Sequence, residues 1–320
     1  METADAPTDG AEVPLDPPLF EDLARAKVNL FLHLRGRRPD GRHELQSLAV
    51  FPEIGDRLRA EPSALRSLSL EGPFAPALET GEDNLALRAV ETLGRALGET
   101  RGVALALDKR LPLAAGLGGG SADAAATLRL LMRLWGRAPE AETLAALALA
   151  LGADVPVCLG SAPALMGGAG ERLRPAPFFP AFHLTLVNPM RALSTAAVFG
   201  ALERREHPPA EPPPARFEDV GALAAYLGRQ RNDLEAPARR LAPAVGAVLG
   251  ALRWSPACRL ARMSGSGATC FGLFETAAEA AAAADAIRAR EPGWWVAAAE
   301  VKPWSRLPED GLWEAPAAPE

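Results

Sequence analysis

The stretch Leu111-Pro112-Leu113-Ala114-Ala115-Gly116-Leu117-Gly118-Gly119-Gly120-Ser121 places four glycines within five positions, directly before an apolar helix-forming segment, residues 122–135. Glycine permits backbone conformations and close approaches that a Cβ atom would forbid. The first N–H groups of a helix have no intrahelical partners and lie at the positive end of its dipole. The pattern therefore predicts a loop that binds phosphate groups through backbone donors. Ser121 would cap the helix or offer a hydroxyl to a phosphate-bound metal ion.

Other interpretations of this glycine loop are tested directly against the sequence. A Walker A loop requires GxxxxGK[ST], and no lysine follows the glycines here. A dinucleotide fingerprint requires GxGxxG, but counting from Gly116 the last position is Ser121, and no suitably spaced acidic residue stands out. A plain flexible loop that only caps a helix stays open, because short glycine motifs also occur without a ligand.

The hydrophobic periodicity of the chain and the positions of its glycines and prolines predict a mixture of helices and strands. Its length of 320 residues predicts two domains. We expect strands over residues 26–34, 45–51, 103–107, 184–187 and 296–301, with a strand–loop–strand around 264–274. We expect helices over residues 84–97, 122–135, 141–151, 194–202, 220–227, 234–252 and 277–290. Residues 1–20 are expected to form a disordered leader, 21–175 and 176–305 the two domains, and 306–320 a tail. The proline-rich residues 207–215 are expected to form a surface loop. These elements are compatible with an α/β (α+β) fold class, which the resemblance given below implies.

Composition excludes several classes of protein. The net charge of −6 argues against a nucleic-acid partner, which would need a basic face. The three cysteines are isolated and odd in number, so the sequence predicts neither a zinc site nor a disulfide framework. The N-terminus lacks the features of a secretory signal. The longest apolar stretch, residues 144–152, is far shorter than the roughly 20 residues of a membrane span. We expect a soluble protein of a reducing cytoplasm, without membrane contact.

Other motifs along the chain fit the phosphate binding predicted for the glycine loop. Ala26-Lys27-Val28-Asn29-Leu30, the segment Pro112–Ala125 and Ser264-Gly265-Ser266-Gly267-Ala268 resemble, in order and spacing, the three motifs of the GHMP kinase superfamily of small-molecule kinases. Within it the likeness is greatest to the family that phosphorylates 4-diphosphocytidyl-2-C-methyl-D-erythritol. Four segments carry this likeness: Ala26-Lys27-Val28-Asn29-Leu30-Phe31-Leu32, Pro39-Asp40-Gly41-Arg42-His43-Glu44-Leu45-Gln46, Gly152-Ala153-Asp154-Val155-Pro156 and Arg231-Asn232-Asp233-Leu234. The resemblance covers about residues 23–301.

The resemblance implies a two-domain kinase whose active site lies in the cleft between the domains, with ATP and Mg²⁺ as cofactors. The reaction implied is ATP-dependent phosphorylation of the substrate's 2-hydroxyl in non-mevalonate isoprenoid biosynthesis. Lys27 would lie beside the attacking hydroxyl, and Asp154, expected at a helix-to-strand junction, would be the general base. A metal site made of protein ligands alone is not expected, since Mg²⁺ would arrive on ATP. The partner is a small molecule, and the chain would be a monomer or a weak homodimer.

The same resemblance assigns the binding residues. The ATP side would consist of Pro112, Leu113, Ala114, Ala115, Gly116, Leu117, Gly118, Gly119, Gly120, Ser121 and Ala122, together with Asn84 and Lys109. The substrate side would consist of Asn29, Arg42, His43, Thr195, Phe199, Gly265, Ser266 and Gly267. In this assignment His43 hydrogen-bonds the cytosine edge and Phe199 stacks on the cytosine ring.

The sequence departs from the family pattern at three of these positions. The family usually has tyrosine at the position of Arg42, and glycines at the positions of Ala114 and Ala115. Arg42 could stack on cytosine in place of the usual ring or bind the substrate diphosphate as a bidentate partner. Two other functions stay open: another GHMP kinase, of the homoserine or mevalonate type, and a catalytically silent nucleotide sensor. Lys27 and Asp154 together argue against the sensor.

Overall fold

The computed structural model describes residues 19–78, 84–204 and 206–305. Nearly all of the expected leader and the whole expected tail lie outside these residues. The described chain begins at Leu19, and its first strand starts at Phe20, which shortens the expected leader by two residues. The boundary expected near residue 175 stays a prediction.

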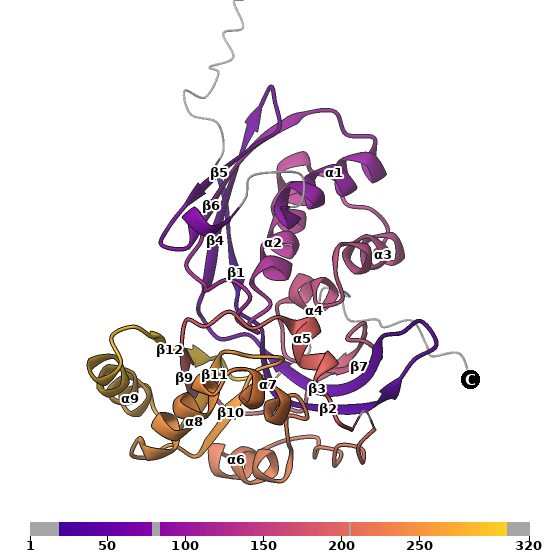
Figure 1. Cartoon of the computed structure of the whole chain (residues 1–320). Helices are drawn as coiled ribbons and strands as arrows, with labels where there is room; N and C mark the ends of the chain where they lie inside the picture. The colour runs from indigo at the N-terminus through magenta and orange to yellow at the C-terminus, as the bar shows by residue number, and fades with distance from the viewer. Residues whose placement is uncertain (1–18, 79–83, 205, 306–320) are drawn as a thin grey trace, which may run out of the picture.

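One half of the molecule, at the top of Figure 1, is a four-stranded sheet with helices packed on one face. The strand order is β1-β4-β6-β5, and only the β5–β6 pair is parallel. The strands are β1 (Phe20–Arg25), β4 (Gly55–Ser63), β5 (Ser67–Glu71) and β6 (Gly102–Asp108), with a short 3₁₀ turn at Ala75–Ala77. The helices are α1 (Leu85–Leu97), α2 (Gly119–Trp135), α3 (Ala141–Leu151) and α4 (Val155–Gly160).

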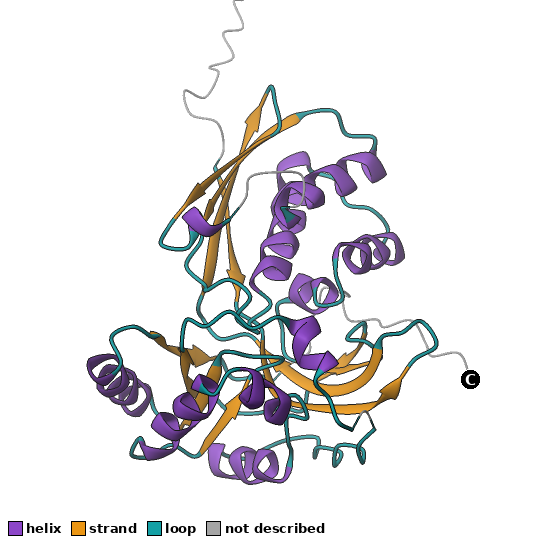
Figure 2. Cartoon of the chain, viewed as in Figure 1, coloured by secondary structure: helices purple, strands orange, loops and turns teal. Residues whose placement is uncertain are grey.

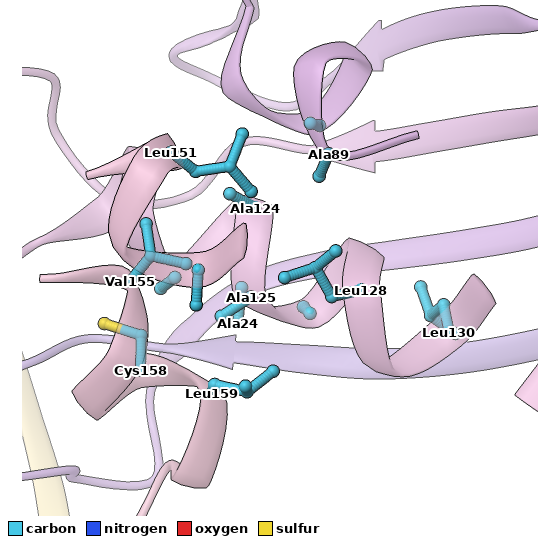
Figure 3. Close-up of a cluster of buried hydrophobic side chains, with 14 of the residues drawn as sticks. Ala24, Ala89, Ala124, Ala125, Leu128, Leu130, Leu151, Val155, Cys158 and Leu159 are labelled. Carbon is cyan, nitrogen blue, oxygen red and sulfur yellow. The ribbon is translucent and has the colours of Figure 1, made fainter. Parts of the chain in front are cut away.

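Helix α2 is buried in this half and packs mainly through small side chains. Ala124 and Ala125 are fully buried, and Figure 3 shows them beside Val155 of α4. Alanine brings the helix backbone close to its neighbours, so the start of α2 is held firmly against the sheet. The close packing fixes the position of the glycine loop that precedes the helix.

Two further sheets build the other half (Figures 1 and 2). One has the order β2-β3-β7-β8 and the other β10-β11-β9-β12, and every neighbouring pair in both is antiparallel. Their strands are β2 (Val28–Arg37), β3 (His43–Val50), β7 (Ala164–Gly167), β8 (Arg172–Pro175), β9 (Phe182–Asn188), β10 (Leu260–Met263), β11 (Cys270–Phe274) and β12 (Trp295–Val301). The helices are α5 (Thr195–Gly200), α6 (Val220–Arg229), α7 (Glu235–Leu241), α8 (Ala244–Trp254) and α9 (Ala277–Arg290).

Several expected elements need correction. The helix expected over 234–252 is two helices, because Pro243 cannot donate a backbone hydrogen bond and the chain bends there. The strand–loop–strand expected around residues 264–274 begins earlier in the chain. Its first strand, β10, ends before residue 264, and residues 264–269 form the loop. Helix α2 begins at Gly119, so two of the four glycines are helical. Strands β1, β4, β5, β7 and β8 were not expected. Among the described residues, no helix is both long and apolar enough to cross a membrane.

Candidate active site

The glycine loop turns from β6 into α2 and leaves backbone donors uncovered. Gly118 adopts a left-handed conformation, with φ +64°, and forms the N-cap of α2. No side chain of the described residues caps this helix start. The N–H groups of Gly119, Gly120 and Ser121 are therefore the unpaired first-turn donors that bind phosphate in other proteins. Ser121 lies inside the first turn, so the expectation that it caps the helix is wrong.

The loop of the third motif packs directly against the glycine loop. Thr269 N–H donates to the Ala115 carbonyl at 3.1 Å, and the Ser264 hydroxyl donates to the Gly116 carbonyl at 3.0 Å. A Cβ atom on Gly116 would lie 2.7 Å from the carbonyl oxygens of both Ser264 and Gly267. Gly116 is therefore required for the two loops to touch, and the two loops form one rigid wall.

Lys27 and Asp154 form an ion pair beside this wall. Lys27 Nζ donates to Asp154 Oδ2 at 2.9 Å, and the Lys27 N–H donates to the Leu117 carbonyl at 2.8 Å. The lysine side chain is 7% exposed and the aspartate side chain 36% exposed. Asp154 lies between α3 and α4, so the expected helix-to-strand junction is a helix-to-helix junction. Its carboxylate makes no capping bond to α4, which argues against a purely local turn role.

A second charged cluster lies behind the glycine loop. Lys109 Nζ donates to Asp56 Oδ2 at 2.5 Å and to Asp123 Oδ2 at 2.6 Å, with all three side chains buried. Asp56 Oδ1 accepts the N–H groups of Arg110, at 2.6 Å, and Leu111, at 2.8 Å. The cluster therefore ties the start of the loop to the first turns of α2 and holds the loop's shape.

Burial and the neighbouring charges shift the pKa values of this cluster in opposite directions. Burial acts to lower the pKa of Lys109, but the carboxylates of Asp123 and Asp56 outweigh it and the pKa is raised. Burial raises the pKa of Asp123 above its ordinary value, although Lys109 partly opposes the change. Asp123 Oδ1 accepts no hydrogen bond from any described residue. The Asp123 carboxyl is thus buried beside Lys109 with one oxygen unpartnered among the described residues.

Hydrogen bonding fixes the orientation of the Asn29 amide. The Ser47 hydroxyl donates its single proton to the Phe31 carbonyl at 2.6 Å. Ser47 must therefore accept the 2.7 Å bond from Asn29 Nδ2. Asn29 Oδ1 then faces away from Ser47, is buried and has no partner among the described residues. Asn29 also lines the cleft, so it presents an acceptor there.

Two predicted substrate residues, His43 and Phe199, stack on each other. Their ring centroids are 4.8 Å apart with planes inclined by 27°. No base fits between rings this close, so a cytosine would stack on the other face of Phe199 or displace His43. Thr195, one turn before Phe199 on α5, has its Oγ1 2.8 Å from Ser266 Oγ. The start of α5 is thereby joined to the loop of the third motif.

One cleft of about 700 Å³ brings most of the predicted residues together. Its predicted lining residues are Lys27, Asn29, Asn84, Lys109, Pro112, Leu113, Ala114, Ala115, Gly116, Gly118, Gly119, Gly120, Ser121, Asp154, Thr195, Phe199, Gly265 and Ser266. The predicted residues that do not line it are Arg42, His43, Leu117, Ala122 and Gly267. Leu117 and Ala122 are buried in the core instead. Arg42 lies on an exposed turn.

Two of the residues assigned to ATP have structural partners of their own. The ammonium group of Lys109 is held by its two carboxylates, as described above. Asn84 is the N-cap of α1, and its Oδ1 accepts the Ala86 N–H at 2.9 Å. Their contacts with adenosine stay predictions.

Sequence reasoning missed Asp56, Asp123 and Ser47. Asp123 carried a usable signal, because it is an acidic residue in an otherwise apolar stretch of helix two positions after Ser121. Asp56 and Ser47 carried none, because their roles depend on partners 53 and 18 positions away along the chain.

Comparison with known proteins agrees with this geometry. The GHMP kinase N-terminal domain model matches residues 84–167, and the GHMP kinase C-terminal model matches residues 213–293. A 4-diphosphocytidyl-2-C-methyl-D-erythritol kinase of Cereibacter sphaeroides is 52% identical over 284 residues, covering 88% of this chain and 99% of that protein. The enzyme of the same name from Paracoccus denitrificans is 53% identical over 282 residues, covering 88% and 97%.

Solved structures give the same result. A crystal structure of 4-(cytidine 5'-diphospho)-2C-methyl-D-erythritol kinase superposes with a TM-score of 0.72 at 38% identity, covering 88% of this chain and 99% of that one. A homoserine kinase from Cytophaga hutchinsonii superposes with a TM-score of 0.65 at 18% identity, covering 89% and 96%, and shows the shared fold alone. This chain therefore belongs to the GHMP kinases, and within them to the 4-diphosphocytidyl-2-C-methyl-D-erythritol kinase family.

Proposed function

We propose that this chain transfers the γ-phosphoryl group of ATP to the 2-hydroxyl of 4-diphosphocytidyl-2-C-methyl-D-erythritol, a step of non-mevalonate isoprenoid biosynthesis. The observation that carries this proposal is the Lys27–Asp154 ion pair at the edge of the glycine loop. A base and a cation stand there beside a phosphate-binding loop, in the same cleft as Phe199. This is the combination that phosphoryl transfer to an alcohol requires.

Asp154 acts as the general base. Its carboxylate is the more exposed member of the pair, so a substrate hydroxyl can reach it and give up its proton. The bond to Asp154 holds the Lys27 ammonium group beside the reacting oxygens, and the bond from the Lys27 backbone N–H to the Leu117 carbonyl anchors its main chain to the glycine loop. Its positive charge stabilises the negative charge that develops during transfer. A positioned base contributes about 10² to 10⁴ in rate.

The glycine loop binds the phosphate groups of ATP through the N–H groups of Gly119, Gly120 and Ser121. The described residues hold no group of three or more His, Cys, Asp or Glu side chains that could bind a metal ion by themselves. Ser121 and Asp123 are lining residues of the cleft, and the Ser121 hydroxyl and the buried, unpartnered Asp123 Oδ1 are oxygens that would hold a Mg²⁺ ion arriving with ATP. When bound, Mg²⁺ neutralises part of the phosphate charge.

Substrate recognition uses other residues of the same cleft. Asn29 Oδ1 accepts a hydroxyl of the sugar alcohol, and Phe199 stacks on the cytosine ring. Gly265 and Ser266 line the cleft where backbone can approach the substrate diphosphate. We expect a monomer or a weak homodimer. Free thiols at Cys158, Cys258 and Cys270 fit a reducing cytoplasm.

The test is ATP turnover against a small panel of alcohols. The panel contains 4-diphosphocytidyl-2-C-methyl-D-erythritol, homoserine and mevalonate, with CDP binding measured in parallel. Turnover with the cytidylyl substrate alone, together with CDP binding, supports the proposal. Turnover with homoserine or mevalonate would assign the chain to another GHMP activity. ATP binding without turnover of any alcohol would indicate a nucleotide sensor.

A further inference from the structure

A second pocket, of about 560 Å³, lies outside the active-site cleft. It is formed by α7, the end of α8, the residues that follow α8, and β10, in the lower half of Figure 1. The two pockets share no lining residue. The function proposed above makes no use of this second pocket.

The lining of the second pocket concentrates positive charge. Five of its residues are arginines: Arg231, Arg239, Arg253, Arg259 and Arg262. Glu235 is the only acidic residue that lines it. In a chain whose net charge is −6, such a cluster of guanidinium groups in one concavity is a strong local reversal of sign.

Among the described residues, only three of these five arginines form an ion pair with a carboxylate. The pairs are Arg231 Nε with Asp233 Oδ1 at 2.6 Å, Arg259 Nη2 with Glu275 Oε2 at 2.9 Å, and Arg239 Nη1 with Glu235 Oε1 at 3.9 Å. The last separation is at the limit of an ion pair, so the Arg239 charge is only weakly compensated.

Arg262 is a buried cation without a carboxylate partner among the described residues. It is 6% exposed, and its guanidinium donates to the carbonyls of Leu30, Leu227 and Gln230 at 2.6–2.8 Å. Burial lowers its pKa to about 10, so it stays charged at neutral pH. Carbonyl oxygens satisfy its N–H groups but do not neutralise its charge.

Arg253, the exposed residue at the rim, has no hydrogen bond or ion pair with any described residue. Its guanidinium is therefore available to a ligand without breaking an existing contact. Arg253 thus adds an unpaired positive charge to a pocket whose lining also includes the buried cation Arg262, on which Glu235 acts at a distance.

We propose that this pocket binds a small anion that carries a phosphate group. Guanidinium groups bind phosphate through paired, charge-assisted hydrogen bonds, and a concave site with surplus positive charge favours a compact, multiply charged anion. The pocket contributes no glycine loop and no base, so the bound anion is held and not turned over. The site is separate from the phosphate-binding loop of the cleft.

The test is calorimetric titration of inorganic phosphate into the whole enzyme, with the active site filled by an excess of a non-hydrolysable ATP analogue and Mg²⁺. We expect saturable binding to the filled enzyme. Arg253→Ala should weaken it about tenfold, as expected for losing a charge-assisted contact, and Arg253→Lys should weaken it less. Arg95→Ala, which removes an exposed arginine from α1 in the other half, is the matched control and should bind like the wild type.

Three results would overturn the proposal. The first is no saturable binding to the filled enzyme with a Kd below about 10 mM. The second is unchanged affinity in Arg253→Ala. The third is an equal loss in Arg253→Ala and Arg95→Ala, which would mean general charge attraction. Arg253 is exposed at a helix end, so folding is not at risk, and retained kinase turnover in each variant verifies it.

Discussion

Lys27 Nζ lies 2.9 Å from Asp154 Oδ2, although 127 positions separate the two residues along the chain. The strand that follows Lys27 and the helix that follows Asp154 bring them together beside Gly118. A Cβ atom on Gly118 would lie 3.3 Å from Lys27 Cβ and 3.9 Å from Asp154 Oδ2. The Lys27–Asp154 pair and the glycine loop are thus neighbours, as the proposed transfer from ATP to a hydroxyl beside Asp154 requires.

The glycine loop predicts a specific sensitivity at Gly119. In Gly119→Val, the new Cβ atom would lie 3.2 Å from Lys109 Nζ, and its branches would cover the backbone donors of the first turn. We expect ATP affinity, measured by calorimetry, to fall at least about tenfold, the cost of a lost charge-assisted hydrogen bond. Gly120→Ala is the control, because its nearest neighbour is a flexible Leu85 methyl at 3.4 Å. Equal ATP affinity in Gly119→Val and wild type would remove the loop from phosphate binding.

Ser47 is expected to act on the substrate only through Asn29. Ser47→Ala removes the acceptor that orients the Asn29 amide, so the KM for the alcohol substrate should rise about fivefold, the value of one hydrogen bond. The kcat and the KM for ATP should change little. Ser69→Ala removes another strand hydroxyl, bonded to the Leu105 carbonyl at 3.3 Å, and controls for stability. An unchanged alcohol KM in Ser47→Ala would show that Asn29 needs no such support.

Substitutions of Arg42 test how the protein binds the cytidylyl part of its substrate. If Arg42 stacks on the base, Arg42→Tyr should restore or improve the KM for the cytidylyl substrate and Arg42→Ala should raise it severalfold. If Arg42 binds the diphosphate, tyrosine should be as poor as alanine, and substrate binding should fall steeply with added salt. We expect stacking, although Arg42 lies on an exposed turn and does not line the cleft, because the neighbouring His43 contacts Phe199. Steady-state kinetics at two salt concentrations decides between them.

His33 makes the stability of the fold depend on pH. Burial first, and then the charge of Arg231, lower its pKa from 6.5 to about 4, while Asp233 acts in the opposite direction and Arg262 and His207 add to the lowering. Between pH 6.5 and about 4, His33 binds a proton in the unfolded chain but not in the folded chain. The contribution of His33 to stability is therefore complete above pH 6.5 and is lost as the pH falls towards 4, by on the order of 3 kcal/mol.

Denaturant unfolding of His33→Gln measures this contribution. The glutamine cannot titrate, so the variant should lose less stability than the wild type between pH 6.5 and 4. His183→Gln, at a partly exposed histidine, serves as the control. Identical pH slopes in wild type and His33→Gln would contradict the assignment.

Local patterns predicted the parts of the molecule that depend on neighbouring residues. Gly98 and Gly136 end α1 and α2 in the left-handed conformation expected of C-terminal glycines. The edge strands β5 and β8 were not predicted, because they are short and their pairing depends on distant partners. The division of the 234–252 segment at Pro243 could have been predicted from proline chemistry alone.

The residues of the candidate site also divide into those that the sequence predicted and those that it did not. The resemblance of the motifs around Lys27, Asp154 and the glycine loop to those of the GHMP kinases predicted a shared cleft, whereas Lys27 alone would be interpreted as an exposed strand lysine. The cluster of Lys109 with Asp56 and Asp123 was not predicted, because it forms only when β4, β6 and α2 pack together. Only Asp123, an acidic residue in an apolar stretch of helix, carried a local sequence signal for this cluster.

The most direct test of the central claim is the ³¹P NMR spectrum of the product that wild type and Asp154→Asn form from ATP and 4-diphosphocytidyl-2-C-methyl-D-erythritol. Carbon 2 of the substrate bears the methyl group and no hydrogen, so a 2-phosphate gives a phosphomonoester signal unsplit by protons. We expect this unsplit signal from the wild type, and its formation slowed at least about 10²-fold in Asp154→Asn, with ATP affinity retained. Asp219→Asn, a change at the N-cap of α6, is the control and should act like the wild type. A proton-split phosphomonoester signal, or near-normal turnover by Asp154→Asn, would contradict the account.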